Sequence, residues 1–271
     1  MVAYDSAKLA LENRSGLSAA ERRLLAVTPL HAITSVHGQA GLCERLLIEI
    51  GRFPAPDRRR IDTAFALMSL VHASDRRQRE PYASHPLRVT IRILSHYRVD
   101  DPDVACAALL HDAVEDHAED LGRDGTREGA FKMLGRYFGG RVADLVAAVT
   151  NPVWEPGRDE HEQYREHVTA SLAASPWARM IKASDFTDNA VGIIHLTSPK
   201  LARLAGKYGP LVPALREFIV RPDTPLEADV KDMIADQFDA ARERFAAIGT
   251  AHPVPMAPAN CRAAVGLSPS G

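Results

Sequence analysis

The segment DVACAALLHDAVED (103–116) decides the fold of this 271-residue chain. Its apolar run, VACAALL, leaves no polar face around a helix, so this helix is expected to be central and buried. Pro102 stands just before the run, where proline fits the first turn of a helix. The run ends in His111 and Asp112, and Glu115 and Asp116 follow. A buried helix that ends in four ionisable side chains needs a partner for them.

These four side chains are expected to gather on one turn of helix. At 3.6 residues per turn, His111 shares a face with Glu115, and Asp112 shares one with Asp116. Burial of such groups is costly unless they are paired. A divalent metal suits this mixed nitrogen and oxygen set, and Mn, Fe, Zn and Co all accept it. The alternative for this segment alone is a solvated helix end with a chance His-Asp pair.

Two further segments complete a set of metal ligands. EPYASHPL (80–87) puts His85 at a junction between a loop and a helix, and MIKASDFTDNAVG (180–192) puts Asp185 after an apolar run. Either residue alone would be interpreted as structural or exposed. Together with His111-Asp112 they supply H…HD…D, the ligand pattern of an HD-type metal site. We therefore expect one divalent ion, with His85, His111, Asp112 and Asp185 as its ligands.

The rest of the chain favours helices over strands. Aromatic residues make up only 6% of the sequence, and the abundant Ala and Leu favour helix. Apolar residues recur at helical spacing over 30–50, 61–71, 199–219 and 225–247. GRFPAPD (51–57) is expected to separate the helix at 30–50 from the helix at 61–71. Residues 117–129 are expected to form a polar loop. No segment shows strand alternation, so the predicted class is all-α.

Composition also narrows the surroundings in which the chain works. A formal net charge of −2 does not favour nucleic-acid binding through bulk electrostatics. No apolar stretch approaches the roughly 20 residues that a membrane span needs, and the N-terminus lacks the pattern of a signal peptide. Cys43, Cys106 and Cys261 show no disulfide spacing and are expected to be reduced thiols. We expect a cytoplasmic protein.

Residues 61–210 resemble the hydrolase domain of the RelA/SpoT family, and most of all the stand-alone small alarmone hydrolases and the metazoan SpoT homologue. The resemblance lies in five ordered motifs, whose spacing also matches approximately. They are His72 with Arg76-Arg77, EPYASHP (80–86), AALLHDAVED (107–116), FGGRVADLVAAVT (138–150) and KASDFTDN (182–189). The resemblance implies an HD-domain bundle of about ten helices, with N- and C-terminal helical extensions.

The resemblance also implies an activity. Members of this family hydrolyse the 3′-pyrophosphate of ppGpp or pppGpp and release pyrophosphate with GDP or GTP. His85, His111, Asp112 and Asp185 match the ligands of an ion that is normally manganese, although other divalent metals suit the same set. Glu115 and Asp116 match the pair that orients and deprotonates the attacking water. Elementary chemistry agrees, because a divalent ion activates water and polarises phosphoryl oxygens.

The expected substrate contacts come from the same comparison. Arg76 and Arg77 match a basic pair beside the nucleotide, and arginine suits phosphate recognition. Taken alone, this pair would be interpreted as a solvated helix end. Lys182 matches a residue near the site, and Asn189 matches a residue near the ribose. His72 is expected to support the site rather than bind metal, and the other histidines, His117 among them, show no ligand-like context.

Several positions depart from the family pattern. Phe186 stands where Arg or Lys usually follows the last metal-binding Asp, which removes a cation beside the substrate. HASD (72–75) replaces the usual H-x-G-Q, Arg79 stands where Gly is common, and the segment 117–130 is longer than usual. These departures keep two alternatives open. One is an HD phosphohydrolase for another nucleotide, such as an NADPH 2′-phosphatase or an adenosine alarmone hydrolase. The other is a degenerate HD module that binds nucleotide or protein, although the loss of a metal ligand would be its expected mark.

The matched region suggests how the chain is divided. We expect an N-terminal helical extension over 1–55, an HD hydrolase domain over 56–210, C-terminal helices over 211–248 and a disordered tail over 249–271. The expected partner is a nucleotide substrate, with no nucleic acid and no membrane. The helical pattern at 30–50 could either pack on the hydrolase domain or form the contact of a homo-oligomer.

Overall fold

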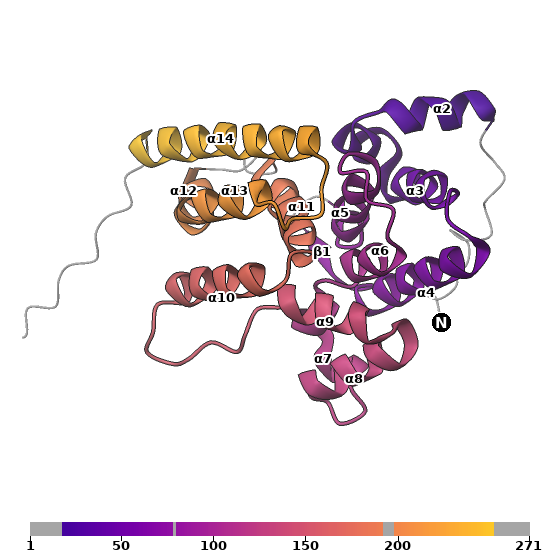
Figure 1. Cartoon of the computed structure of the whole chain (residues 1–271), viewed down its shortest axis with the longest axis horizontal. Helices are drawn as coiled ribbons and strands as arrows, with labels where there is room; N and C mark the ends of the chain where they lie inside the picture. Colours follow the sequence, from indigo (N-terminus) through magenta and orange to yellow (C-terminus); the bar gives the residue numbers. More distant parts are fainter. Residues whose placement is uncertain (1–17, 78–79, 192–197, 252–271) are drawn as a thin grey trace, which may run out of the picture.

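The computed structural model describes residues 18–77, 80–191 and 198–251, and these residues form a bundle of α-helices (Figure 1). Within these ranges the one sheet is a hairpin of β1 (Arg76–Arg77) and β2 (Glu80–Pro81), paired antiparallel. The predicted all-α class is therefore confirmed. No described helix combines the length and the apolar character that a membrane crossing requires.

Three helices form the centre of the bundle. They are α5 (Ser84–Ser95), α6 (Pro102–Leu109) and α11 (Ala178–Val191), and α5 contacts both of the others. Every residue of the α6 run 104–108 is fully buried, as expected for a segment without a polar face. The helix begins at Pro102, and the Asp101 side chain accepts hydrogen bonds from two backbone N–H groups of its first turn, which stabilises the start of the helix.

The N-terminal helices pack on this centre. They are α2 (Ala19–Val27), α3 (Leu30–Ile50) and α4 (Ala55–Val71). α3 contacts α5 through buried apolar side chains that include Ile33, Leu42 and Leu46, and α4 contacts α6. α3 bends at Gly38, whose positive φ of 61° suits glycine. The helical pattern at 30–50 therefore packs against the central helices, which is one of the two arrangements that the sequence left open.

Three shorter helices follow the buried segment, at the bottom of Figure 1: α7 (Ala113–Leu121), α8 (Arg127–Phe138) and α9 (Gly140–Val149). The expected loop at 117–129 is wrong in its extent, because α7 continues to Leu121 and α8 begins at Arg127. Gly122 ends α7, and Thr126 caps α8 by accepting a hydrogen bond from the Gly129 N–H. The connection between the two helices is therefore limited to residues 122–126.

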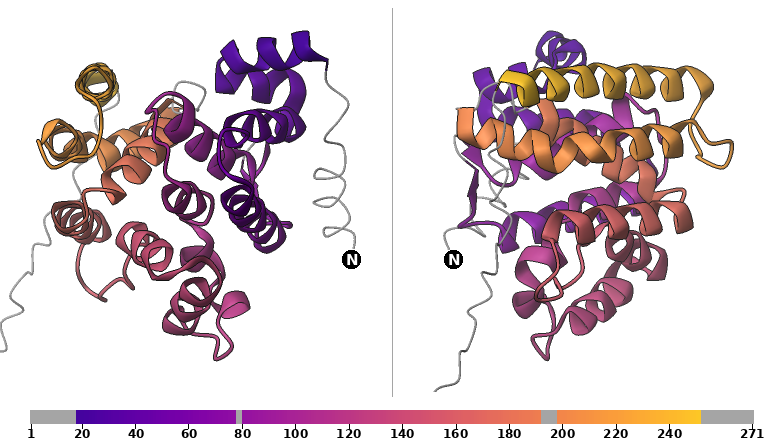
Figure 2. Two further views of the ribbon diagram at one scale, coloured as in Figure 1. Left: turned by 45° about the vertical axis from the view of Figure 1, so that its right-hand side comes forward. Right: turned by 90° about the vertical axis from the view of Figure 1, so that its left-hand side faces the viewer.

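The C-terminal helices form a second packed group (Figure 2). They are α10 (Glu160–Ala174), α12 (Ser198–Tyr208), the 3-10 helix η2 (Gly209–Leu211), α13 (Val212–Val220) and α14 (Ala228–Ala251). The single helix expected over 199–219 is divided at Gly209-Pro210, and α13 packs on α14. Most of the expected disordered tail, residues 252–271, lies outside the described residues.

Candidate metal centre

Two buried histidine nitrogens face two carboxylates where the central helices meet. Asp185 Oδ1 lies 3.2 Å from His85 Nε2 and 3.8 Å from His111 Nε2. Asp112 Oδ2 lies 3.6 Å and 3.2 Å from the same two nitrogens. Among the described residues, neither Nε2 atom has a hydrogen-bond partner, although buried polar groups normally have one. A divalent ion shared by these four side chains would satisfy both nitrogens, so the donor set fits the metal that the sequence predicted.

The four side chains come from three different segments. His85 lies in the first turn of α5, and Asp185 lies in the middle of α11. His111 and Asp112 occupy the turn between α6 and α7, since α6 ends at Leu109 and α7 begins at Ala113. The expectation that His111 shares a helix face with Glu115 is therefore wrong, because His111 precedes the helix. Asp112 and Asp116 do lie one turn apart, and the Asp116 N–H donates to the Asp112 carbonyl oxygen over 3.0 Å.

The outer nitrogen of each imidazole is fixed by a hydrogen bond. His85 Nδ1 lies 2.8 Å from Asp188 Oδ2, and His111 Nδ1 lies 2.9 Å from the carbonyl oxygen of Ala108. A ring that donates through Nδ1 presents an unprotonated Nε2, which is the form that binds a metal. The sequence assigned Asp188 no role. Its position one helical turn after Asp185 was the available signal.

Asp188 is itself held by arginines. Arg88 donates to both of its oxygens over 2.8 and 2.9 Å, and Arg92 donates to Oδ1 over 3.2 Å. Burial alone would raise the pKa of Asp188, but the hydrogen bonds from His85 and Arg88 and the charge of Arg88 hold that pKa well below its usual range. Asp188 is therefore ionised at neutral pH and orients His85 from the side away from Asp112 and Asp185.

The carboxylates of Asp112 and Asp185 also have outer partners. The Tyr82 hydroxyl donates to Asp112 Oδ2 over 2.6 Å. Lys182 Nζ donates to Asp185 Oδ2 over 3.1 Å, and Asn189 Nδ2 donates to Asp185 Oδ1 over 2.7 Å. Such outer partners hold metal ligands in a fixed orientation. Tyr82 lies in the EPY motif, but the sequence alone assigned it no role.

The predicted substrate-contact residues separate into two groups. Lys182 and Asn189 contact Asp185 directly, and Arg77 Nη1 donates to Asn189 Oδ1 over 3.1 Å. Arg76 is exposed on β1, and no contact joins it to these groups in the part of the chain that the structure describes. Alternation along a strand accounts for this difference, since neighbouring strand residues point to opposite faces.

Glu115 and Asp116 lie in the first turn of α7. Both carboxylate oxygens of Glu115 accept hydrogen bonds from Asn151, one from its backbone N–H over 3.1 Å and one from its side-chain amide over 2.7 Å. Burial raises the pKa of Asp116 to about 6, and the charges of Asp112 and Glu115 add to the effect. A carboxyl group with a pKa near neutrality is suited to accept or return a proton.

A second lysine accompanies Lys182, and the sequence did not identify it. Lys207 Nζ on α12 lies 4.6 Å from the ring centroid of Tyr164, and Lys182 Nζ lies 5.5 Å from the same centroid. Burial lowers the pKa of Lys207, and the charge of Lys182 lowers it further. The two lysines therefore bring two cationic groups to one buried aromatic ring beside Asp185.

Phe186 faces the C-terminal helices rather than the metal ligands. Its side chain is buried, and its ring makes edge-to-face contacts with Tyr208, Phe238 and Phe245 at centroid distances of 5.3 to 6.2 Å. Aromatic pairs of this geometry stabilise a core. The residue that replaces a cation in the family pattern therefore joins α11 to α12 and α14.

Comparison with known proteins gives relatives of one kind. No family model matches the chain. It is 36% identical over 106 residues to the guanosine-3′,5′-bis(diphosphate) 3′-pyrophosphohydrolase MESH1 of Danio rerio, and the aligned segment covers 39% of this chain and 51% of that protein. It is 28% identical over 180 residues to the guanosine-3′,5′-bis(diphosphate) 3′-pyrophosphohydrolase of Aquifex aeolicus, and the aligned segment covers 64% of this chain and 24% of that protein.

A solved structure agrees with these matches in fold. It was described as a metazoan orthologue of SpoT that hydrolyses ppGpp, and it superposes with a TM-score of 0.53 at 23% identity, covering 70% of this chain and 97% of that one. The matched segment spans about half the length of the MESH1 relatives from fish and mammals. The chain therefore contains an HD-type helical domain similar to that of the small alarmone hydrolases.

Proposed function

We propose that this protein is a metal-dependent phosphohydrolase that removes the 3′-pyrophosphate of ppGpp or pppGpp. The metal site is supported by the buried Nε2 atoms of His85 and His111. Among the described residues these atoms have no hydrogen-bond partner, and they face the carboxylates of Asp112 and Asp185. The names of the curated relatives support the same reaction. In this reaction the protein would bind the metal ion, bind the anionic nucleotide and accept a proton from the attacking water.

The four ligands would hold one ion, and we propose Mn²⁺. Two imidazoles and two carboxylates suit Mn²⁺ and also accept Fe²⁺, Co²⁺ and Zn²⁺. When bound, the ion would supply a Lewis acid that neutralises charge on the phosphoryl oxygens. Asp188 and Tyr82 would keep His85 and Asp112 oriented toward it, as the hydrogen bonds of 2.8 and 2.6 Å indicate.

The reaction requires one proton acceptor beside the phosphorus. A water oxygen forms a bond to the phosphorus attached to the 3′-oxygen, and the bond between that phosphorus and the 3′-oxygen breaks. The 3′-oxygen takes up a proton, which Asp116 would return to it, and becomes the 3′-hydroxyl of GDP or GTP, while the attacked group is released as pyrophosphate. We assign Asp116 to accept the proton of the water, since its pKa of about 6 lets it take and release a proton near neutral pH. Glu115, fixed through both oxygens by Asn151, would orient the same water.

The substrate carries two pyrophosphate groups, and the chain offers cations for them. Lys182, Lys207 and Arg77 lie around Asp185 and Asn189. Cations next to a buried site attract phosphate strongly because little water screens them. Phe186 removes the cation that the family pattern has at this position. Lys207 supplies a positive charge nearby, so the proposed substrate site remains basic.

The alternative nucleotides serve as comparisons in the test. Full-length protein with Mn²⁺ would be incubated with ppGpp, NADPH and an adenosine alarmone, and pyrophosphate and phosphate release would be measured separately. The proposal predicts pyrophosphate from ppGpp at a rate far above phosphate release from NADPH. Phosphate release from NADPH, with ppGpp unchanged, would contradict it. His37→Gln, a change at an exposed histidine of α3, is the control for handling and stability.

A further inference from the structure

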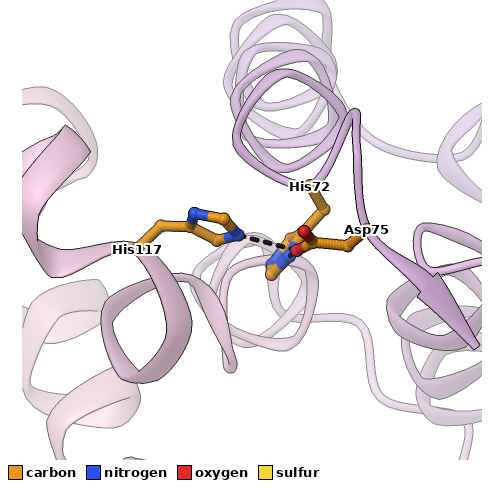
Figure 3. A group of neighbouring side chains, drawn as sticks. All are labelled: His72, Asp75 and His117. Atoms are coloured by element: carbon orange, nitrogen blue, oxygen red, sulfur yellow. Dashed lines mark hydrogen bonds and ion pairs between the residues drawn. The ribbon is translucent and has the colours of Figure 1, made fainter.

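A second cluster of metal-binding side chains lies outside the candidate metal centre. Asp75 Oδ2 lies 2.8 Å from His72 Nδ1 and 2.7 Å from His117 Nε2. Figure 3 shows the two imidazoles pointing at the Asp75 carboxylate from different elements. His72 ends α4, Asp75 lies in the turn before β1, and His117 lies in α7. The cluster therefore joins the segment 72–75 to His117, which follows it by more than 40 residues.

The spacing of these atoms suits a single ion. One nitrogen or oxygen from each of the three side chains lies within 4.8 Å of the others. Zinc binds imidazole nitrogen and carboxylate oxygen at about 2.0–2.2 Å in a tetrahedral arrangement, so two ligands of one ion lie roughly 3.3–3.6 Å apart. Small rotations of the three side chains would therefore bring all of the donor atoms to bonding distance.

The histidines are held as metal ligands usually are. The His72 side chain is 1% exposed, and its ring stacks on Tyr82 at a centroid distance of 4.4 Å. His117 departs from helical geometry within α7, with φ −135° and ψ 34°. Its other nitrogen, Nδ1, lies 3.2 Å from Asp120 Oδ2. A carboxylate on the outer nitrogen of an imidazole is the usual companion of a metal-bound histidine.

Asp75 is particular to this chain within the resemblance described above, because HASD stands where the family pattern has H-x-G-Q. A glutamine at this position would offer a neutral amide, whereas Asp75 offers a carboxylate. Hydrogen bonds from His117 and His72 lower its pKa, so it is ionised at neutral pH. The cluster thus combines two imidazoles with one negative charge, which is a donor set that binds zinc with an open fourth position.

We propose that His72, Asp75 and His117 bind a second divalent cation of the zinc type, and that Asp120 orients His117. The ion would be separate from the one at His85 and Asp185. It would connect the end of α4, the turn before β1 and α7. It would also fix Tyr82, since His72 stacks on the Tyr82 ring and the Tyr82 N–H donates to the Asp75 carbonyl oxygen over 3.2 Å.

The competing explanation is a cluster held by protons alone. In that case one Asp75 oxygen accepts a hydrogen bond from each histidine, and His117 is an imidazolium between Asp75 and Asp120. The two explanations differ in what the protein binds. Only the metal site predicts that the loss of His117 or Asp75 removes an ion.

The test counts ions in full-length protein. Protein whose metal has been removed with a chelator would be dialysed against Zn²⁺ and then freed of unbound zinc. The bound zinc per chain would be measured by elemental mass spectrometry. We expect His117→Gln and Asp75→Asn each to bind one ion fewer per chain than the unchanged protein and the His37→Gln control. Equal zinc content in all four proteins would overturn the proposal. Far-ultraviolet circular dichroism would show that each variant is folded, and Asp75→Asn keeps the shape of the side chain.

Thermal unfolding supplies a second readout that does not depend on catalysis. An ion that binds only the folded state raises the unfolding temperature. Zn²⁺ should therefore still raise the unfolding temperature of an Asp112→Asn variant, whose first centre is impaired. The addition of His117→Gln to that variant should abolish most of the rise. An undiminished rise in the double variant would contradict the second site. That result would not bear on metal binding at the candidate metal centre or on the hydrolysis of ppGpp, which are measured separately.

Discussion

The hydroxyl of Tyr82 donates a 2.6 Å hydrogen bond to Asp112 Oδ2, and so joins the EPY motif to the HD motif. Burial raises the pKa of Tyr82, and the negative charges of Asp112 and Asp116 raise it further. Tyr82 therefore remains a protonated donor at neutral pH. It fixes one carboxylate ligand and also supports the His72 ring at a centroid distance of 4.4 Å.

Tyr82→Phe should weaken binding of Mn²⁺ to the first centre by about tenfold or more, because the loss of an outer partner of a metal ligand typically costs that much. The Phe ring would keep the stack on His72. A titration of chelated protein with Mn²⁺, followed by electron paramagnetic resonance, measures the change. Tyr137→Phe, at an exposed position of α8, is the matched control. Equal affinities in the two variants would show that the hydroxyl does not support Asp112.

Asp188→Asn should destabilise the fold by about 3 kcal/mol or more, since removal of one member of a buried charged network leaves the others unpaired. Arg92 would lose a carboxylate that lies 3.2 Å away, and His85 would lose the partner of its Nδ1. Urea unfolding at neutral pH measures the free energy. Asp144→Asn, at an exposed position of α9, should change it by less than about 0.5 kcal/mol. A small effect of Asp188→Asn would contradict the importance of this network.

The same carboxylate predicts how stability depends on acid. The pKa of Asp188 is lower in the folded protein than in the unfolded chain, where a value near 4 is usual. The stabilisation that it provides is therefore complete above about pH 4 and is lost as the pH falls toward the folded value. Unfolding free energies measured from neutral pH down to pH 3 should fall less steeply for Asp188→Asn than for the unchanged protein. Parallel curves would show that Asp188 is not the group responsible.

Phe186→Arg tests whether this position belongs to the core or to the substrate site. The Phe186 ring lies 5.3 Å from the ring of Phe238 and is buried, so an arginine there would lose packing and bury an unpaired charge. We expect a loss of stability of about 3 kcal/mol or more and no gain in turnover of ppGpp. Phe186→Leu should cost less, because it keeps an apolar side chain. A stable Arg variant with tighter substrate binding would place the residue at the substrate site instead.

Lys207→Met should raise the KM for ppGpp by about tenfold and change kcat much less, because the loss of one charged contact costs about 1.5–3 kcal/mol. Lys207 shares the Tyr164 ring with Lys182, which places it beside the proposed substrate site. Lys207→Arg should restore part of the affinity. Lys132→Met, at an exposed lysine of α8, is the control. An unchanged KM would remove Lys207 from the substrate site.

Local motifs were sufficient to predict the residues that meet at the first centre. His85 and Asp185 each carry a weak signal alone, but together with His111-Asp112 they complete the HD pattern. The apolar character of 104–110 predicted that α6 is central, and these residues are buried. The signal was weaker where the structure depends on how segments pack. Taken alone, RRQRE (76–80) would be interpreted as a helix end, yet Arg76–Arg77 pairs with Glu80–Pro81 in a hairpin, since two-residue strands have no detectable periodicity.

Long-range partners could not be predicted from local spacing. Lys207 reaches Tyr164 because α12 packs near α10, and no motif joins the two segments. His117 was left without a ligand context because its partners, His72 and Asp75, precede it by more than 40 residues. Phe186 was judged by its place in a motif, whereas the neighbours that give it a core role come from α12 and α14.

Pyrophosphate release from ppGpp should be measured with protein whose metal has been removed by a chelator, before and after Mn²⁺ is restored, with Asp185→Asn beside the unchanged protein. We expect no release without metal, release after Mn²⁺ is added, and none from Asp185→Asn under either condition. Release that persists in chelated protein, or in Asp185→Asn without bound metal, would contradict the assignment of His85, His111, Asp112 and Asp185 as the metal centre of a hydrolase.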